Sequence, residues 1–208
     1  MTGAIFGQSR SIRFGAGLNG LAAPLVLAAL FLAGGLHWAE WQWQRDGIAA
    51  GQWWLLLSGH FAHATPAHGI SNFAAVVIAA LVAPVWLNRW PGLVIVLAMA
   101  AGVGLGIWWF NPDIAFYRGF SGVGHGWLMV AFAWSPYLSP WFRMLAIVVI
   151  QAKVVWEDSL VYQASQLNGY FADAEVLTDA HWYGVLLALP LVLAFFALRF
   201  YQDRGKAS

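Results

Sequence analysis

The chain contains no cysteine and few charged residues. The absence of cysteine excludes disulfide bonds, thiolate nucleophiles, zinc fingers and iron–sulfur clusters. Charged residues make up 9% of the 208 residues, against about 25% in a soluble domain, and hydrophobic residues make up 61%. With a formal net charge of only +1, the chain also lacks the strongly basic surface that binds nucleic acid. We therefore expect one membrane domain over residues 1–208, with lipid around it and no nucleic-acid partner.

Hydrophobic runs, separated by breaks that contain proline and glycine, predict six membrane-spanning helices. A helix needs about 20 apolar residues to cross a hydrocarbon core of ~30 Å. The predicted spans are 18–37, 67–87, 92–110, 120–136, 140–157 and 180–200. The first span follows Arg10 and Arg13, as a signal peptide would, but Ala33-Gly34-Gly35 is a poor cleavage site and we interpret the span as retained. The predicted fold is an all-α bundle of six transmembrane helices.

Basic residues predict the orientation, because cytoplasmic loops carry an excess of lysine and arginine. With cytoplasmic tails at about 1–17 and 201–208, most basic residues lie inside: Arg10, Arg13, Arg89, Arg143, Arg199, Arg204 and Lys206. Arg45 and Arg118 lie outside, and Lys153 falls within the fifth span. All acidic residues but Asp203 lie outside: Glu40, Asp46, Asp113, Glu157, Asp158, Asp173, Glu175 and Asp179. The opposite orientation would reverse this bias.

Tryptophans mark the predicted ends of the spans, because indole rings prefer the headgroup level of a bilayer. Many of them fall in the first loop, residues 38–60: Trp38, Trp41, Trp43, Trp53 and Trp54. This loop is too polar to span, and we expect it to lie in the outer interface. Anchoring of the bundle is favoured over a role in guiding substrates.

Polar residues within membrane spans are costly and are functional candidates by default. His68 and Asn72 are four residues apart at the start of the second span, so they share one helical face and could donate hydrogen bonds toward one point. Ser121 opens the fourth span between Gly119 and Gly122, whose small size leaves the hydroxyl open to approach. Each pattern alone is more typical of helix packing than of a functional site.

The three predicted spans that carry these residues enter the membrane from the same side. His181 opens the sixth span, as Ser121 opens the fourth and the pair His68 and Asn72 opens the second. These side chains therefore share one depth and can converge if the helices are neighbours. Residues 121–134 rise only about 21 Å, so the fourth span must start below the surface or extend upward through residues 117–120.

These residues supply what acyl transfer requires. Serine becomes a good nucleophile when a neighbouring base takes its proton, and histidine is the usual base, so Ser121 and His181 are the predicted pair. No carboxylate is well placed as a third member, because Asp179 lies two residues before His181 and points elsewhere on the helix. His68 and Asn72 are the candidate oxyanion donors, and the backbone N–H of Ser121 at a helix N-terminus could assist.

His125 lies one helical turn after Ser121 on the same face. It could be an alternative base, or it could pack against the imidazole of His181 and tune it. Packing is the favoured interpretation.

The combined motifs resemble those of the rhomboid intramembrane serine proteases: His63-x4-His68-x3-Asn72, Gly119-x-Ser121-Gly122 and Ala180-His181-x2-Gly184. The resemblance implies a nucleophile at Ser121, a base at His181, oxyanion donors at His68 and Asn72, and no cofactor or metal. Rhomboids often have an aromatic residue at the place of His125, which puts its role in doubt. The resemblance covers about residues 50–190.

The segment from Tyr117 to Gly126 and the compact six-span length are similar to the rhombosortases, a rhomboid-like group of Gram-negative bacteria. This resemblance implies an inner-membrane enzyme whose site opens to the periplasm. Its implied substrates are exported proteins with a C-terminal Gly-Gly motif, a transmembrane helix and a basic tail. Either water or an amine could resolve the acyl-enzyme.

Three alternatives remain open at this point. The chain could be a general rhomboid protease of other transmembrane substrates, or a catalytically inactive relative that binds helices. It could also be a cofactor-binding or transport protein, because paired histidines such as His68, His125 and His181 could ligate haem or a metal.

Overall fold

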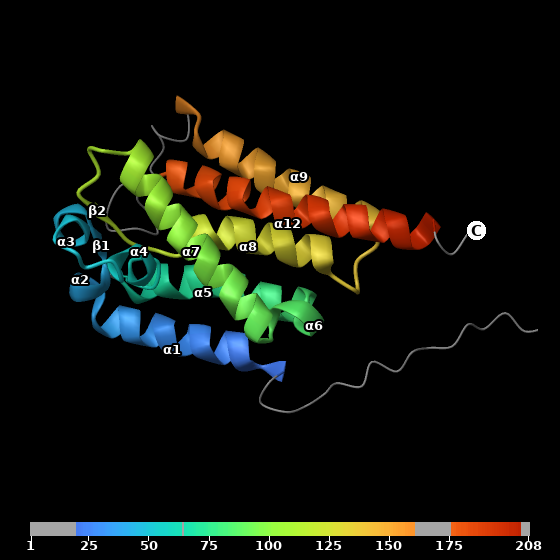
Figure 1. Cartoon of the computed structure of the whole chain (residues 1–208), viewed down its shortest axis with the longest axis horizontal. Coiled ribbons are helices and arrows are strands. Elements are labelled where there is room, and N and C mark those ends of the chain that lie inside the picture. Colours follow the sequence, from blue (N-terminus) through green and yellow to red (C-terminus); the bar gives the residue numbers. More distant parts are fainter. Residues whose placement is uncertain (1–19, 64, 161–175, 205–208) are drawn as a thin grey trace, which may run out of the picture.

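The structure is a computed structural model that describes residues 20–63, 65–160 and 176–204. Six longer helices lie side by side in a bundle (Figure 1). They are α1 (Ala22–Leu36), α5 (Pro66–Val82), α7 (Trp90–Phe110), α8 (Ser121–Trp134), α9 (Pro140–Glu157) and α12 (Asp179–Arg204). Each corresponds to one of the predicted hydrophobic runs, and the prediction of a mainly helical fold is confirmed.

Some of the predicted features lie outside the described residues. These are the N-terminal tail 1–17 with Arg10 and Arg13, the acids Asp173 and Glu175, and the end of the C-terminal tail with Lys206. Helix α12 continues to Arg204, so residues 201–204 of the predicted tail are helical.

The second predicted run is broken near its end. Helix α5 stops at Val82, and a separate short helix, α6 (Pro84–Leu87), follows it. Proline has no backbone N–H and disfavours the helical conformation of the residue before it. Ala83 accordingly has φ −134° and ψ 52°, which ends α5 and turns the chain into α6.

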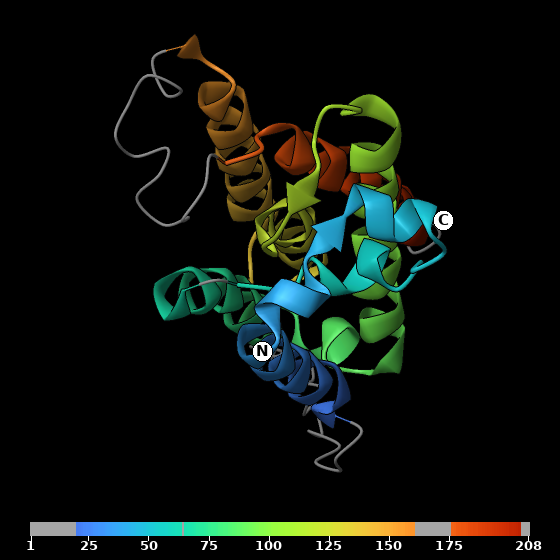
Figure 2. The ribbon, with the colours of Figure 1, turned by 90° about the vertical axis from the view of Figure 1, so that its left-hand side faces the viewer.

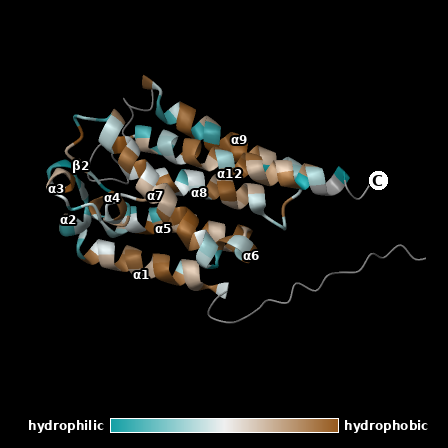
Figure 3. Cartoon of the chain, in the orientation of Figure 1, coloured by the Kyte–Doolittle hydropathy of each residue, from teal (hydrophilic) through white to brown (hydrophobic). Residues whose placement is uncertain are grey.

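Among the described residues, two helices are long and apolar enough to cross a membrane: Trp90–Phe110 and Asp179–Tyr201. Helices α1 and α5 are apolar but shorter, with 15 and 17 residues. Hydrophobic residues dominate the bundle, and hydrophilic residues are frequent in the short elements at one end (Figure 3). Large apolar side chains also face outward around the bundle, among them Leu32, Ile70, Leu81, Trp109 and Leu193.

The first loop folds into short elements that cover one end of the bundle (Figure 2). They are α2 (Trp38–Trp41), β1 (Trp43–Gln44), α3 (Arg45–Ala49) and α4 (Leu55–Ser58). Strand β1 pairs antiparallel with β2 (Phe116–Tyr117), which lies just before α8. The two strands were not predicted, because a strand of two residues is too short to show an alternating hydrophobic pattern.

Trp43 does not lie at the surface as expected for the tryptophans of this loop. Its side chain is fully buried and donates its indole N–H to the carbonyl of Gly104 at 3.2 Å. Gly59 makes room for it, because a Cβ there would lie 2.6 Å from the Trp43 backbone nitrogen. Trp53 and Trp54, in contrast, are exposed. The prediction was wrong for Trp43 because this part of the loop packs into the same core as the helices of the bundle.

Arg45 attaches this loop to the end of α7. The last carbonyl groups of a helix have no partner within it, and a cation there is favourable. The guanidinium lies over the rings of Trp43 and Trp108, 5.1 and 4.8 Å from their centroids. It donates at 2.9 to 3.2 Å to four carbonyls at this end of the molecule, those of Ile107, Trp108, Asn111 and Ile114.

Replacing Arg45 by methionine should lower the free energy of unfolding by about 2–3 kcal/mol, because several carbonyls lose a charged donor. Thermal unfolding of the detergent-solubilised protein measures this effect. Arg89→Met, at an exposed position, is the matched control and should melt with the wild type. Equal melting temperatures for the two variants would contradict the capping role of Arg45.

Candidate active site

Helix α8 is the central helix of the bundle and carries Ser121 at its first position. It packs against α5, α7, α9 and α12, and most of its residues are buried. The residues before it are extended in β2 or irregular, so the helix starts at Ser121 and does not continue upward through residues 117–120. The sequence left open whether this helix begins at Ser121 or extends upward, and in the structure it begins at Ser121.

Glycines bring α8 and α12 into backbone contact. Gly122 and Gly126 on α8 face Ala180 and Gly184 on α12, in the small-residue spacing of closely packed membrane helices. A Cβ on Gly122 would lie 2.7 Å from the carbonyl oxygen of Ala180. A Cβ on Gly184 would collide with the carbonyl of Gly122. The glycine after Ser121 therefore serves this contact.

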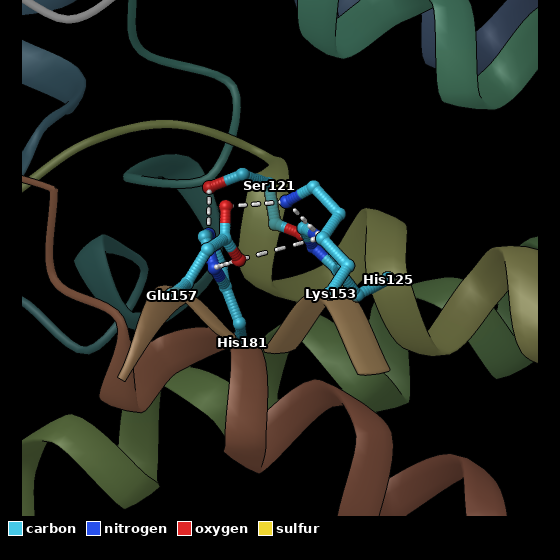
Figure 4. A network of polar contacts seen from close by, with 5 residues as sticks. All are labelled: Ser121, His125, Lys153, Glu157 and His181. Carbon is cyan, nitrogen blue, oxygen red and sulfur yellow. Dashed lines mark hydrogen bonds and ion pairs between the residues drawn. The ribbon is translucent and has the colours of Figure 1, made fainter. Parts of the chain in front are cut away.

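This contact places His181 beside Ser121 (Figure 4). The Oγ of Ser121 lies 2.9 Å from Nε2 of His181, within hydrogen-bond distance. His181 is only 2% exposed, whereas Ser121 is partly exposed. The two predicted residues, 60 positions apart in the chain, thus form a hydrogen-bonded pair.

A carboxylate completes the arrangement, which corrects the expectation that none is well placed. The Oε2 of Glu157 lies 2.9 Å from Nδ1 of His181, on the side opposite to Ser121, and Glu157 is 4% exposed. Asp179 does point elsewhere, as expected, and accepts a hydrogen bond from Asn111 at 2.5 Å. The prediction missed Glu157 because it lies 24 residues before His181, at the end of a different helix.

A signal for Glu157 was present in the sequence. Ile147, Ile150, Val154 and Glu157 form the buried face of α9, with the spacing of a helix stripe. Lys153, a basic residue in the middle of an apolar run, is four residues before Glu157, where an acidic partner is expected.

His125 lies against His181, in agreement with the favoured interpretation that it packs there. The ring centroids are 4.3 Å apart and the planes are tilted by 31°. Its Nδ1 is 2.6 Å from the carbonyl oxygen of Ser121, and its Nε2 is 2.9 Å from the ammonium of Lys153. Since neither nitrogen contacts the Ser121 hydroxyl in this arrangement, His125 is not placed as its base.

His68 and Asn72 lie on the buried face of α5, as their spacing predicted, and each is 8% exposed. Both approach Gly119, two residues before Ser121. A Cβ on Gly119 would lie 2.8 Å from Nε2 of His68 and 3.4 Å from Nδ2 of Asn72. Glycine is required there for a second reason, since its φ of +114° is unfavourable for other residues.

His63 orients Asn72, a role that the sequence did not reveal. Its Nδ1 donates to the Phe61 carbonyl at 2.8 Å, and its Nε2 accepts from the Asn72 amide at 3.1 Å. The ring also meets His68 edge to face, with centroids 4.9 Å apart. Burial lowers the pKa of His63 to about 4, and the neighbouring His68 adds to the effect. His63 is therefore neutral at pH 7 and able to accept this hydrogen bond.

Backbone contacts hold the segment before Ser121. The Gly119 N–H donates to the Gly59 carbonyl at 3.0 Å, and the Tyr117 hydroxyl donates to the Gly119 carbonyl at 2.9 Å. Burial raises the pKa of Tyr117 above its usual range, which keeps the hydroxyl protonated. His60, fully buried against Tyr117, has its pKa lowered to about 4 by burial.

A cavity of about 500 Å³ lies between α1 and α5 and not over Ser121. Its lining is mainly apolar, with Phe31, Leu32, Ile70 and Phe73. The ring of His63, which holds the Asn72 amide, forms part of its wall.

His125, Glu157 and His181 place ligand atoms within 4.8 Å of one another, as a metal site would. The Lys153 ammonium, however, already contacts His125 and Glu157. The rings of His125 and His181 are also in direct contact, with centroids 4.3 Å apart, so they do not face each other across a space for haem. The geometry therefore fits an internal ammonium better than a metal ion or a porphyrin.

Comparison of the chain with protein-family models, with curated proteins and with solved structures found no match. The functional interpretation therefore depends on the residues and their geometry.

Gly184→Ala should destabilise the contact between α8 and α12, because the added methyl collides with the Gly122 backbone. We expect a net loss of about 1–3 kcal/mol in the free energy of unfolding. Gly35→Ala is the matched control, since a Cβ on Gly35 meets nothing within 4 Å and alanine favours the helix. The unfolding temperatures of the two variants in detergent test this prediction. Equal temperatures would contradict the close contact between Gly184 and Gly122.

The protein should lose stability as the pH falls from about 6.5 to 4. In this range the unfolded chain binds a proton at His60 and at His63, but the folded chain does not. Each histidine therefore lowers the free energy of unfolding by up to about 3 kcal/mol. His60→Phe should reduce the loss, whereas His37→Asn, at an exposed position, should not. Unfolding temperatures measured from pH 7 to 4 test this. A loss that is the same in wild type and His60→Phe would contradict it.

Proposed function

We propose that this chain is an intramembrane serine endopeptidase, with Ser121 as nucleophile and His181 as general base. The hydrogen bond between Ser121 Oγ and His181 Nε2 carries the proposal. A serine and a histidine in this contact are the elements of an activated nucleophile. The outward-facing apolar side chains of the bundle support a membrane location, in which α1, α5, α7, α8, α9 and α12 all span.

The reaction follows from the contacts of the two residues. The Ser121 oxygen attacks the scissile carbonyl carbon, and its proton passes to Nε2 of His181. The oxygen of the tetrahedral intermediate carries the negative charge, and His68, Asn72 and the first N–H groups of α8 are its candidate donors. Phe120, which precedes the helix, has no side-chain hydrogen bond to these N–H groups. His181 then protonates the leaving amine, and the acyl group stays on Ser121 until water or another amine attacks it.

The proposed substrates are membrane-anchored exported proteins with a C-terminal Gly-Gly motif, a transmembrane helix and a basic tail. The similarity of residues 117–126 to the rhombosortases supports this choice. Glycine also disfavours the helix by about 1 kcal/mol relative to alanine, so a Gly-Gly segment would extend readily toward Ser121. The proposed location is the inner membrane of a Gram-negative bacterium, with the site open to the periplasm. A general rhomboid protease acting on other transmembrane helices is the alternative.

A fluorophosphonate probe tests the proposal, because it labels only serines that are activated as nucleophiles. Detergent-solubilised wild type should be labelled, whereas Ser121→Ala should not be and His181→Ala should be labelled at least about 10²-fold more slowly. His125→Phe keeps an aromatic ring on His181 and should still be labelled. Folding of each variant is checked by its unfolding temperature.

The pattern of labelling decides between the assignments. Labelling that survives His181→Ala but is lost in His125→Phe would make His125 the base. A folded wild type that is not labelled would contradict the protease proposal.

A further inference from the structure

We infer that Glu157 and Lys153 act together as positioning residues that fix His181 in the tautomer able to accept the Ser121 proton. The inference deepens the proposed function and depends on it, because the tautomer matters only if His181 is a base. Both residues lie on α9, four residues apart, and face His181 and His125 across the helix interface (Figure 4).

Glu157 selects the tautomer through its hydrogen bond to Nδ1 of His181. A neutral imidazole carries its proton on one nitrogen only, and an ionised carboxylate can only accept. The contact of 2.9 Å therefore requires the proton on Nδ1 and leaves Nε2 as the acceptor that faces Ser121. The positive charge that His181 gains during attack is also balanced by the adjacent carboxylate.

Lys153 allows this carboxylate to be buried. A buried charge is costly unless it is paired, and Glu157 is only 4% exposed. The ammonium of Lys153 forms an ion pair with Oε1 of Glu157, while Oε2 faces His181. The Lys153 side chain is 47% exposed, so it neutralises the site without being fully buried itself.

Lys153 also determines the state of His125. An ammonium only donates hydrogen bonds, so Nε2 of His125 must accept from it, and Nδ1 carries the proton donated to the Ser121 carbonyl. His125 is then a neutral ring whose basic nitrogen is occupied. His125 therefore packs between Lys153 and His181 and does not exchange a proton with Ser121.

These assignments predict how an amide at position 157 would behave. An amide has one accepting oxygen and one donating nitrogen. If Lys153 holds the oxygen, the NH₂ group faces Nδ1 of His181 and forces the proton onto Nε2, the wrong nitrogen for a base. Without the ammonium, the oxygen can turn toward His181 and restore the useful tautomer. Removing Lys153 should therefore partly rescue Glu157→Gln.

The rate constant for fluorophosphonate labelling tests this inference in Glu157→Gln, Lys153→Met and the double variant. Glu157→Gln should be slower by about 10²–10⁴-fold, the upper figure being the effect of the change from carboxylate to amide in a serine protease triad. Lys153→Met should lose less, since the contact of Glu157 with His181 remains. The double variant should be labelled about tenfold faster than Glu157→Gln. The control is Asp158→Asn, at the adjacent exposed position, which should stay within about twofold of wild type.

A second measurement does not depend on the variants of Glu157 and Lys153. The ¹⁵N resonances of the wild-type histidine rings, with His181 assigned by comparison with His181→Ala, should show the proton on Nδ1. A proton on Nε2, or a double variant no faster than Glu157→Gln, would overturn the inference. A labelled wild type with an equally fast Glu157→Gln would also overturn it and leave the protease proposal intact. An unlabelled wild type would instead remove the proposed function itself.

Discussion

The candidate site depends on the backbone contact between α8 and α12. Two helices separated by ordinary side chains keep their axes about 8–10 Å apart. Gly122, Gly126 and Gly184 remove the side chains from this interface, and the carbonyls of one helix lie against the glycines of the other. Ser121 and His181 each adjoin this contact along the chain. Their hydrogen bond is therefore a consequence of how the two helices pack.

The other helices contribute to the site around this contact. Helix α5 brings His68 and Asn72 to the segment before Ser121, and His63 holds the Asn72 amide. Helix α9 brings Glu157 to the far side of His181. The short elements of the first loop hold the segment that precedes α8, through the pairing of β1 with β2 and the Arg45 contacts at the end of α7. These elements thus position the groups around Ser121 and the segment that precedes it.

The sequence predicted the helices well, since long apolar runs bounded by proline and glycine leave few alternatives. It also identified Ser121, His181, His68 and Asn72 as neighbours, because the predicted topology puts all four at one depth, near the start of their spans. The prediction failed where two residues in contact are far apart in the sequence and the local pattern around each is weak. Glu157 was counted only among the acids of the outer side, and Trp43 was assigned to the interface by its residue type, but both are buried. The partner of each lies far along the chain, at His181 and Gly104.

Helix α9 carries both the carboxylate and the ammonium of the network, but neither the serine nor the histidine that would react. These two charges form an ion pair within one helical turn, so they stay paired with each other whether or not the helix is docked. A small displacement of α9 would therefore not leave the Glu157 carboxylate without its partner. Ser121 and His181, on α8 and α12, would stay in contact. The imidazole of His181 would then lose the carboxylate that orients it. The hydrogen bond between Ser121 and His181 and the orientation of the His181 ring therefore depend on different helices.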